Sequence, residues 1–493
     1  MTNRKTIEKV VYAFVGFCGL ALVTVALLLA LNSTFSMKPI MTVALAIVVF
    51  AAIVAFLHRQ KILCWLMNHQ IVVKIVIAVI ALAAIVLRFA PLIFQMQYIM
   101  PDDLNDVGVH YYAVPRLAEG WLDENTIDYM KAFPYLAPYA LTLTVFYKLL
   151  FDNIVVAILV SNLLFDAIGG LFCYLLLKKT KIRGAGWIGV LLWCINPMSI
   201  IACWFSMNLV LVNMLLMGLL YCAVCFLEAL RKHQVGRTYV LAVVIGLLVF
   251  VANLFRPLFT VILIALAICT LVTICAARSY KQLPVLIVMI LALIIPTAAT
   301  NIAVKNLVGD DILGSSGGWS FYVGSNYSSQ GSWVPEDRDY FWGEVIPESG
   351  SFAAAQERIK QDGIQRYLSL SPLQIVNHLI NKVGVLFGDA VNSIYGIRST
   401  FGIAYQSKLH NVLSTVVAVF YVMLLSLTFL WMVRNYRRLD ITMALVTLSF
   451  LGLVAAFLIV EVMNRYMMIF YPLLIVYASL MLGKMWAKLR RRF

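Results

Sequence analysis

Long apolar runs recur along almost the whole of this 493-residue chain, and they constrain its fold more than any other feature. A helix that crosses a bilayer needs about 20 mostly apolar residues, and twelve segments come close to that length. Apolar residues make up 63% of the chain and charged residues only 12%, whereas soluble domains carry about 25% charged residues. The sequence therefore predicts an all-α polytopic membrane protein rather than a set of soluble domains. The predicted spans are 10–31, 40–57, 71–94, 154–177, 186–206, 208–228, 238–255, 258–276, 284–304, 410–433, 441–460 and 466–483.

Charge is distributed unevenly between the two sides that these spans define. When each charged residue is assigned to its nearer side, one side holds 23 Lys and Arg residues with 3 acidic residues. The other side holds 15 Lys and Arg residues with 20 acidic residues. Because cytoplasmic loops carry an excess of Lys and Arg, we expect the first side, which includes both termini, to be the cytoplasm. The net charge of +15 is then a consequence of membrane topology, with anionic membrane lipid as a partner and no nucleic acid. We expect a multi-pass protein of a bacterial plasma membrane.

Two long connections lie on the predicted outer side, at about 95–153 and 305–409. The first includes the apolar stretch 134–151, which we expect to form an interfacial or re-entrant helix, because a full crossing would turn the next basic clusters outward. The predicted organisation is two N-terminal spans (1–70), a core with the first outer loop (71–304), the second outer loop (305–409), and C-terminal spans with a basic tail (410–493).

Carboxylates cluster at the start of the first loop, where Asp102, Asp103 and Asp106 directly follow a span. We expect a helix that begins at Pro101, on which Asp106 and His110 share a face because they are four residues apart. A carboxylate at a membrane surface, close to a cationic or hydrogen-bonding group, is suited to accept a proton from a hydroxyl or an amine. The alternative is that these residues cap a helix and form a solvated acidic turn.

Short motifs in both halves of the chain occur in a recognisable order. In the first loop they comprise Asn105, Asp106, Tyr111, Ala113 and Gly120, followed by Phe133, Pro134, Tyr135 and Pro138. Near the C-terminus they comprise Glu461, Asn464, Arg465, Tyr466 and Pro472. With six predicted spans between two outer loops, this order resembles the GT-C glycosyltransferases of the family-39 type, such as the protein O-mannosyltransferases and the lipid A aminoarabinose transferase. The resemblance covers about residues 71–483 and implies a GT-C-like fold.

The resemblance implies an enzyme that transfers a sugar from a polyprenyl-phosphate donor to an extracytoplasmic acceptor, which is a cell-wall polymer, a glycolipid or a protein. Asp106 is then expected to be the catalytic base, with Asp103 as the second candidate. The donor phosphate is expected to contact Arg256, Lys131 and Arg465. Substrate contacts are expected from His110, Tyr111, Asn326, Trp333, Glu461 and Tyr466. Relatives with lipid-monophosphate donors usually need no metal or other cofactor, although the three aspartates could bind a divalent cation.

Several of these residues also have a purely structural interpretation. Arg256 could snorkel to the membrane interface from its span end, and Glu461 and Arg465 could pair within one helical turn. The stretch 317–333 is rich in Gly, Ser, Asn and aromatic residues, which suits sugar binding but also an ordered loop with turns. Asp166, the clear ionisable residue deep within a span, is expected to bond to another helix.

Two other functions stay open from the sequence. A lipid-linked oligosaccharide polymerase or ligase would share the large outer loop and the basic phosphate-binding residues, but it would use a diphosphate donor. A transporter or lipid flippase would need ionisable residues deep within the spans, where Asp166 is the clear one.

Overall fold

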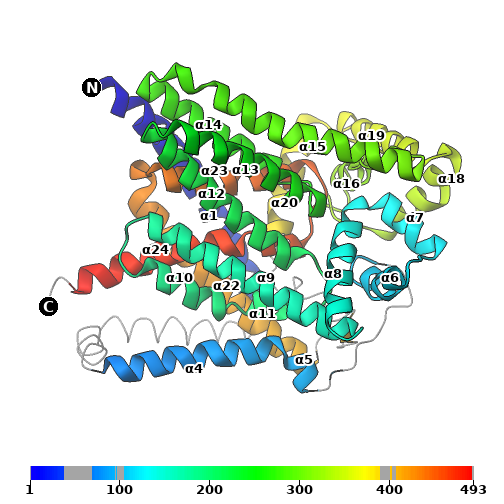
Figure 1. Cartoon of the computed structure of the whole chain (residues 1–493), viewed down its shortest axis with the longest axis horizontal. Helices are drawn as coiled ribbons and strands as arrows, with labels where there is room; N and C mark the ends of the chain where they lie inside the picture. The colour runs from blue at the N-terminus through cyan, green and yellow to red at the C-terminus, as the bar shows by residue number, and fades with distance from the viewer. Residues whose placement is uncertain are drawn as a thin grey trace.

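The computed structural model describes residues 2–37, 69–94, 96, 105–388, 400–401 and 407–490, and every regular element in these ranges is a helix (Figure 1). The predicted span 40–57 and the carboxylates Asp102 and Asp103 lie outside the described residues. The described part of the chain thus confirms the all-α class that the long apolar runs predicted.

Eight described helices are long and apolar enough to cross a membrane, which agrees with a multi-pass membrane protein. Twelve spans and a GT-C-like arrangement stay predictions. The eight helices are α1 (Thr2–Met37), α9 (Ile154–Lys179), α12 (Leu209–Arg231), α13 (Val235–Phe255), α14 (Thr260–Ala277), α15 (Pro284–Val308), α22 (Lys408–Asn435) and α23 (Ile441–Ile459).

Three further predicted spans are shorter or interrupted. The segment 71–94 forms α4 (Gln70–Arg88) and the short α5 (Ala90–Ile93). The segment 186–206 is divided into α10 (Ala185–Cys194) and α11 (Pro197–Ala202), rather than forming the single helix that was predicted. The last segment forms the 3-10 helix η6 (Asn464–Ile469) and then α24 (Tyr471–Arg490).

Local chemistry explains the interruption between α10 and α11. Pro197 has no backbone N–H and disfavours helical continuation, and the Asn196 side chain accepts the backbone N–H of Met198 at 3.1 Å in a helix cap. Met198 therefore does not bond to the carbonyl four residues earlier, which belongs to Cys194. That carbonyl instead accepts a hydrogen bond from Arg88 at 3.1 Å. Irregular backbone inside a bundle needs such replacement partners.

The two predicted outer loops meet at one end of the bundle, and both chain termini lie at the opposite end (Figure 1). The first loop contains α6 (Gly108–Glu119), α7 (Glu124–Ala132), η1 (Pro134–Leu136) and α8 (Ala137–Leu149). The second contains α16 (Gly318–Gly324), α17 (Pro335–Tyr340), the π-helix η3 (Phe341–Val345), α18 (Ile346–Ser349), α19 (Phe352–Leu368) and α20 (Pro372–Gly388). Short 3-10 helices, η2 (Tyr280–Gln282) and η5 (Tyr436–Arg438), lie in connections at the other end.

The two loops share a small core of their own. Its buried residues include Ala132 from the first loop and Trp319 from the second. The Gln356 side chain joins the two loops, because its Nε2 donates to the Ala132 carbonyl at 3.0 Å and its Oε1 accepts the Trp319 N–H at 3.0 Å. A residue carried by one loop is therefore held at a defined distance from residues carried by the other.

The positions of helices α8 and α20 can be compared with the predicted boundary between the membrane and the outer loops. With 13 residues, α8 is too short to cross, and it leaves Leu141, Val145 and Leu149 exposed along one side, as expected for an interfacial helix. The predicted loop 305–409 includes α20, which packs against α1, α23 and η6. Its Phe387 ring lies 6.2 Å from that of Phe450, in the middle of α23, so this end of the loop enters the bundle.

Candidate functional site

Asp106 lies in a turn that precedes a helix, and not within the helix that was predicted to begin at Pro101. Helix α6 starts at Gly108. The side chain of Asn105 accepts the backbone N–H groups of Val107 and Gly108, both at 3.0 Å, which is typical of asparagine in a turn. His110 therefore does not share a helical face with Asp106, and the carboxylate is displayed by a turn at the end of the bundle.

Arg465 is the ion-pair partner of Asp106. Its Nη2 donates to Asp106 Oδ2 at 2.9 Å, across 359 positions of the chain. The predicted pairing of Glu461 with Arg465 within one helical turn is wrong, because α23 ends at Ile459 and the backbone is extended at Val460 and Met463. The extended segment turns Arg465 toward the first loop.

Further polar side chains surround this ion pair. Arg256 caps the C-terminus of α13, and its guanidinium carbon lies 4.3 Å from the centre of the Tyr466 ring. The guanidinium carbon of Arg465 lies 5.7 Å from the same centre. The Tyr129 hydroxyl donates to Asp106 Oδ1 at 3.3 Å. We call the set the polar cluster, and its members are Asp106, Tyr129, Arg256, Glu461, Arg465 and Tyr466.

The polar cluster has two formal negative and two formal positive charges, and it is partly enclosed. Glu461 is only 9% exposed; burial raises the pKa of its carboxyl, an effect that the positive charge of Arg465 opposes. Nε of Arg465 is buried and has no hydrogen-bond partner among the described residues. Within the same residues, Arg256 makes no ion pair. Guanidinium donors are therefore available for an anion.

Five of the predicted site residues thus come together from three distant segments: Asp106, Arg256, Glu461, Arg465 and Tyr466. Tyr129 was not predicted as a site residue. The only sequence feature that could have indicated it is that it is an aromatic residue of the first loop. His110 and Tyr111 are buried at 1% and 3% exposure, and their contact with substrate stays a prediction. Burial lowers the pKa of His110 to about 4, and the ring is therefore neutral at pH 7.

The remaining predicted residues make their contacts elsewhere. Lys131, expected at the donor phosphate, binds Asp128 at 3.2 Å and lies 5.7 Å from the Phe352 ring centre. Asn326 donates to buried Asp337 at 3.0 Å and stabilises the second loop. Trp333 is 40% exposed and lies 6.0 Å from the guanidinium carbon of Arg338. None of these contacts involves the polar cluster.

The glycine- and serine-rich stretch holds the extended segment that carries Glu461. The Glu461 N–H donates to the Ser320 carbonyl at 2.6 Å, and the Val462 N–H donates to the Gly331 carbonyl at 2.9 Å. At Gly324 a Cβ atom would lie 2.4 Å from the Val460 carbonyl carbon, so only glycine permits this approach. The part of the second loop that was expected to bind sugar thus also supports the polar cluster.

A buried lysine outside the predicted site, Lys382, reinforces this support. Nζ of Lys382 donates to the carbonyls of Gly324 at 2.9 Å and Val460 at 2.7 Å, and the side chain is fully buried. Nε2 of His378 bonds to the same Gly324 carbonyl at 2.9 Å. Burial lowers the pKa of Lys382 to about 7, against a weaker opposing effect of Glu461.

The lowered pKa of Lys382 predicts a pH dependence of stability. Between about pH 7 and pH 10 the unfolded chain holds the lysine proton and the folded protein releases it, so the free energy of unfolding rises with pH over that range. In Lys382→Met this rise is expected to be smaller, and overall stability falls because the Val460 carbonyl loses its donor. Thermal unfolding of detergent-solubilised protein at pH 7, 8 and 9 measures both effects. Lys360→Met, at an exposed ion pair of α19, is the control, and an unchanged slope in Lys382→Met would contradict the assignment.

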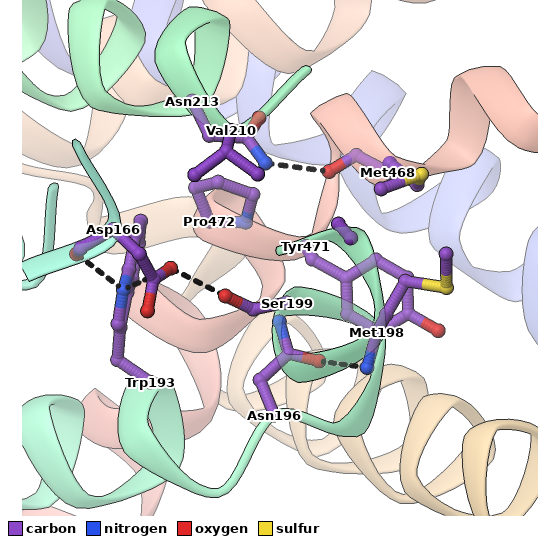
Figure 2. A pocket seen from close by; sticks show the side chains of 11 residues that line it. Asp166, Trp193, Asn196, Met198, Ser199, Val210, Asn213, Met468, Tyr471 and Pro472 are labelled. Atoms are coloured by element: carbon purple, nitrogen blue, oxygen red, sulfur yellow. Dashed lines mark hydrogen bonds between the residues drawn. The ribbon is translucent and has the colours of Figure 1, made fainter. Parts of the chain in front are cut away.

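A second polar group lies within the bundle, around Asp166 (Figure 2). As predicted, Asp166 bonds to another helix, because its Oδ1 accepts from Trp193 Nε1 at 3.0 Å and from the Ser199 hydroxyl. The structure adds an ion pair that was not predicted, in which Arg88 Nη2 lies 2.6 Å from Asp166 Oδ2. These contacts connect α4, α9, α10 and α11 beside a small cavity that Asn213 and Pro472 also line.

No protein-family model matches this chain, and no curated protein matches its sequence. The family stays a prediction that rests on the motifs quoted above. Among the described residues, no group of three or more His, Cys, Asp or Glu is placed to hold a metal ion. Asp102 and Asp103 lie outside that search, and metal independence stays a prediction.

Proposed function

We propose that the protein is an integral-membrane glycosyltransferase that takes a sugar from a polyprenyl-phosphate donor and passes it to an acceptor outside the cytoplasm. The observation that carries the proposal is the polar cluster, in which Asp106 pairs with Arg465, and Arg256 lies over the Tyr466 ring that Arg465 also contacts. A carboxylate and two guanidinium groups in one cluster combine a base with a phosphate-binding site.

Arg256 and Arg465 are the proposed phosphate ligands. A guanidinium group presents planar pairs of N–H donors that match phosphate oxygens, and Nε of Arg465 is a buried donor without a partner among the described residues. The two guanidinium groups share the Tyr466 ring, which orders them before a ligand arrives. Their positive charge would be most valuable when the phosphate departs, because its negative charge grows at that moment.

Asp106 is the proposed base. The acceptor hydroxyl would lose its proton to Asp106, and its oxygen would form the new bond to the anomeric carbon of the sugar. As that bond forms, the bond from the anomeric carbon to the donor oxygen breaks, and its electron pair stays on the lipid phosphate. Direct displacement of this kind inverts the anomeric configuration, as the resemblance to GT-C enzymes implies. Glu461 is a further carboxylate within the polar cluster and would adjust the balance of charge there.

A transfer assay tests the proposal. The purified protein in nanodiscs would be offered radiolabelled polyprenyl-phosphate glucose, N-acetylglucosamine, mannose and galactose, with the matching diphosphate-linked sugars in parallel. We expect label from one monophosphate donor to move to an acceptor or to water. Release from diphosphate donors alone would favour the ligase or polymerase, and flipping of intact lipid without release would favour a transporter or flippase.

Replacing Arg256 tests the phosphate-binding role. We expect Arg256→Gln to raise the KM for the donor about 10- to 100-fold, because charge-assisted hydrogen bonds contribute about 1.5–3 kcal/mol. Steady-state kinetics with increasing donor measure the change. Arg237→Gln is a matched control, since Arg237 lies exposed near the other end of the same helix. An unchanged KM in Arg256→Gln would remove this residue from the donor site.

A further inference from the structure

We infer that Arg465 changes partners during turnover, binding Asp106 in the resting protein and the donor phosphate in the reacting complex. The ion pair therefore withholds the base until a donor is bound, and it re-forms as the lipid phosphate is released. This inference rests on the proposed function and adds a control step to it.

Both oxygens of Asp106 are engaged in the resting protein. Oδ2 accepts from Arg465 at 2.9 Å, and Oδ1 accepts from the Tyr129 hydroxyl at 3.3 Å. An acceptor hydroxyl that reaches Asp106 before the donor does would therefore find both carboxylate oxygens already bonded to Arg465 and Tyr129.

Arg465 is placed to exchange one anion for another. The side chains of Arg465 and Asp106 are 15% and 27% exposed, so the pair is within reach of a ligand. Nε of Arg465 is a donor that Asp106 does not use. Arg465 lies over the Tyr466 ring, as Arg256 does, so a phosphate that draws Arg465 from Asp106 can leave its guanidinium in contact with that ring.

The changes of charge during the reaction explain why Arg465 would leave Asp106 fully for the phosphate in the reacting complex. The donor is a phosphodiester with one negative charge, and the departing lipid phosphate gains a second as the bond to the sugar breaks. Asp106 loses its charge in the same step, because it takes the acceptor proton. The attraction on Arg465 thus shifts from the carboxylate to the phosphate. Loss of the proton from Asp106 to water restores the ion pair and weakens the hold on the lipid phosphate.

Asp106→Asn imitates the protonated state and gives the test, because it frees Arg465 without removing a phosphate ligand. We expect the full-length variant in nanodiscs to bind radiolabelled farnesyl phosphate about 5- to 10-fold more tightly than the wild type, as expected for loss of a partly exposed ion pair that competes with the ligand. Farnesol, which has no phosphate, should bind both proteins equally. Asp128→Asn removes one charge from the same loop, at a carboxylate paired with Lys131, and should leave the affinity for farnesyl phosphate unchanged.

Further variants separate the possible failures. Asp106→Ala should tighten binding as Asp106→Asn does, and adding Arg465→Gln should abolish the gain in either background. Equal or weaker binding of farnesyl phosphate by both Asp106 variants would overturn the inference while leaving the proposed function intact. If the wild type and every variant bind farnesyl phosphate no better than farnesol, the phosphate site itself is absent, and the proposed function fails with the inference.

Discussion

Asp106→Asn is expected to lower the turnover of the proposed transfer reaction about 10²- to 10⁴-fold, the usual contribution of a positioned general base. The amide has nearly the same shape as the carboxylate and still accepts the Tyr129 hydrogen bond, but it takes no proton from an acceptor. Single-turnover transfer at saturating donor measures the effect on the chemical step. Because the variant is also expected to bind lipid phosphate more tightly, the loss should appear in the rate and not in donor affinity.

The control for this prediction is Asp128→Asn, which changes the same charge in the same loop at a position outside the polar cluster. Its transfer rate should equal that of the wild type. Full activity in a folded Asp106→Asn protein would contradict the assignment. The next candidates for the base would then be Asp103, the second candidate from the sequence, and Glu461, which lies within the same cluster and has a carboxyl pKa raised by burial.

The second large effect concerns stability, at the ion pair between Asp166 and Arg88. Asp166→Asn leaves the Arg88 guanidinium buried without a compensating charge, and removing one partner of such a pair typically costs about 3–5 kcal/mol. Both side chains are less than a tenth exposed, so hydration compensates little for the lost ion pair. Thermal unfolding followed with a thiol-reactive dye should report it directly, because Cys173 and Cys203 are buried in the folded bundle.

A double variant distinguishes loss of the ion pair from general disruption of the bundle. Arg88→Met with Asp166→Asn removes both charges and keeps an acceptor for Trp193 and Ser199. We expect its midpoint to lie closer to the wild type than that of Asp166→Asn alone, since a buried pair is often replaceable by uncharged groups. A single variant as stable as the wild type would show that the pair does not hold α4 to α9.

Part of the candidate site could be predicted because its residues carry strong local signals. Asp106 follows an apolar run in an acidic segment, and Arg256 and Arg465 are isolated cations next to span ends. A charged side chain next to a lipid-embedded span is energetically costly. Such residues can therefore be recognised from the amino-acid sequence alone. Asn326, Trp333 and Lys131 were assigned from composition and short motifs, and the structure gives their side chains other contacts.

Pairings between distant segments were not predictable from the same signals. Lys382 looks like one polar residue of an amphipathic helix, and nothing near it in the chain indicates that it binds the carbonyls of Gly324 and Val460. The same holds for Arg88, whose partner Asp166 is 78 positions away. A buried charge finds its counterpart through packing, and packing partners depend on the whole bundle.

The all-α class and the multi-pass membrane architecture could be predicted from the amino-acid sequence, since lipid requires long apolar helices with satisfied backbones. The sequence also singled out Asp106 and Arg465 as residues of interest. That these two residues form one ion pair depends on the packed structure, because the end of α23 at Ile459 and the extended segment after it turn Arg465 away from a helical pairing with Glu461. Sequence spacing describes neighbours along one helix, whereas an ion pair between the first loop and the segment after α23 depends on how the helices that carry them pack.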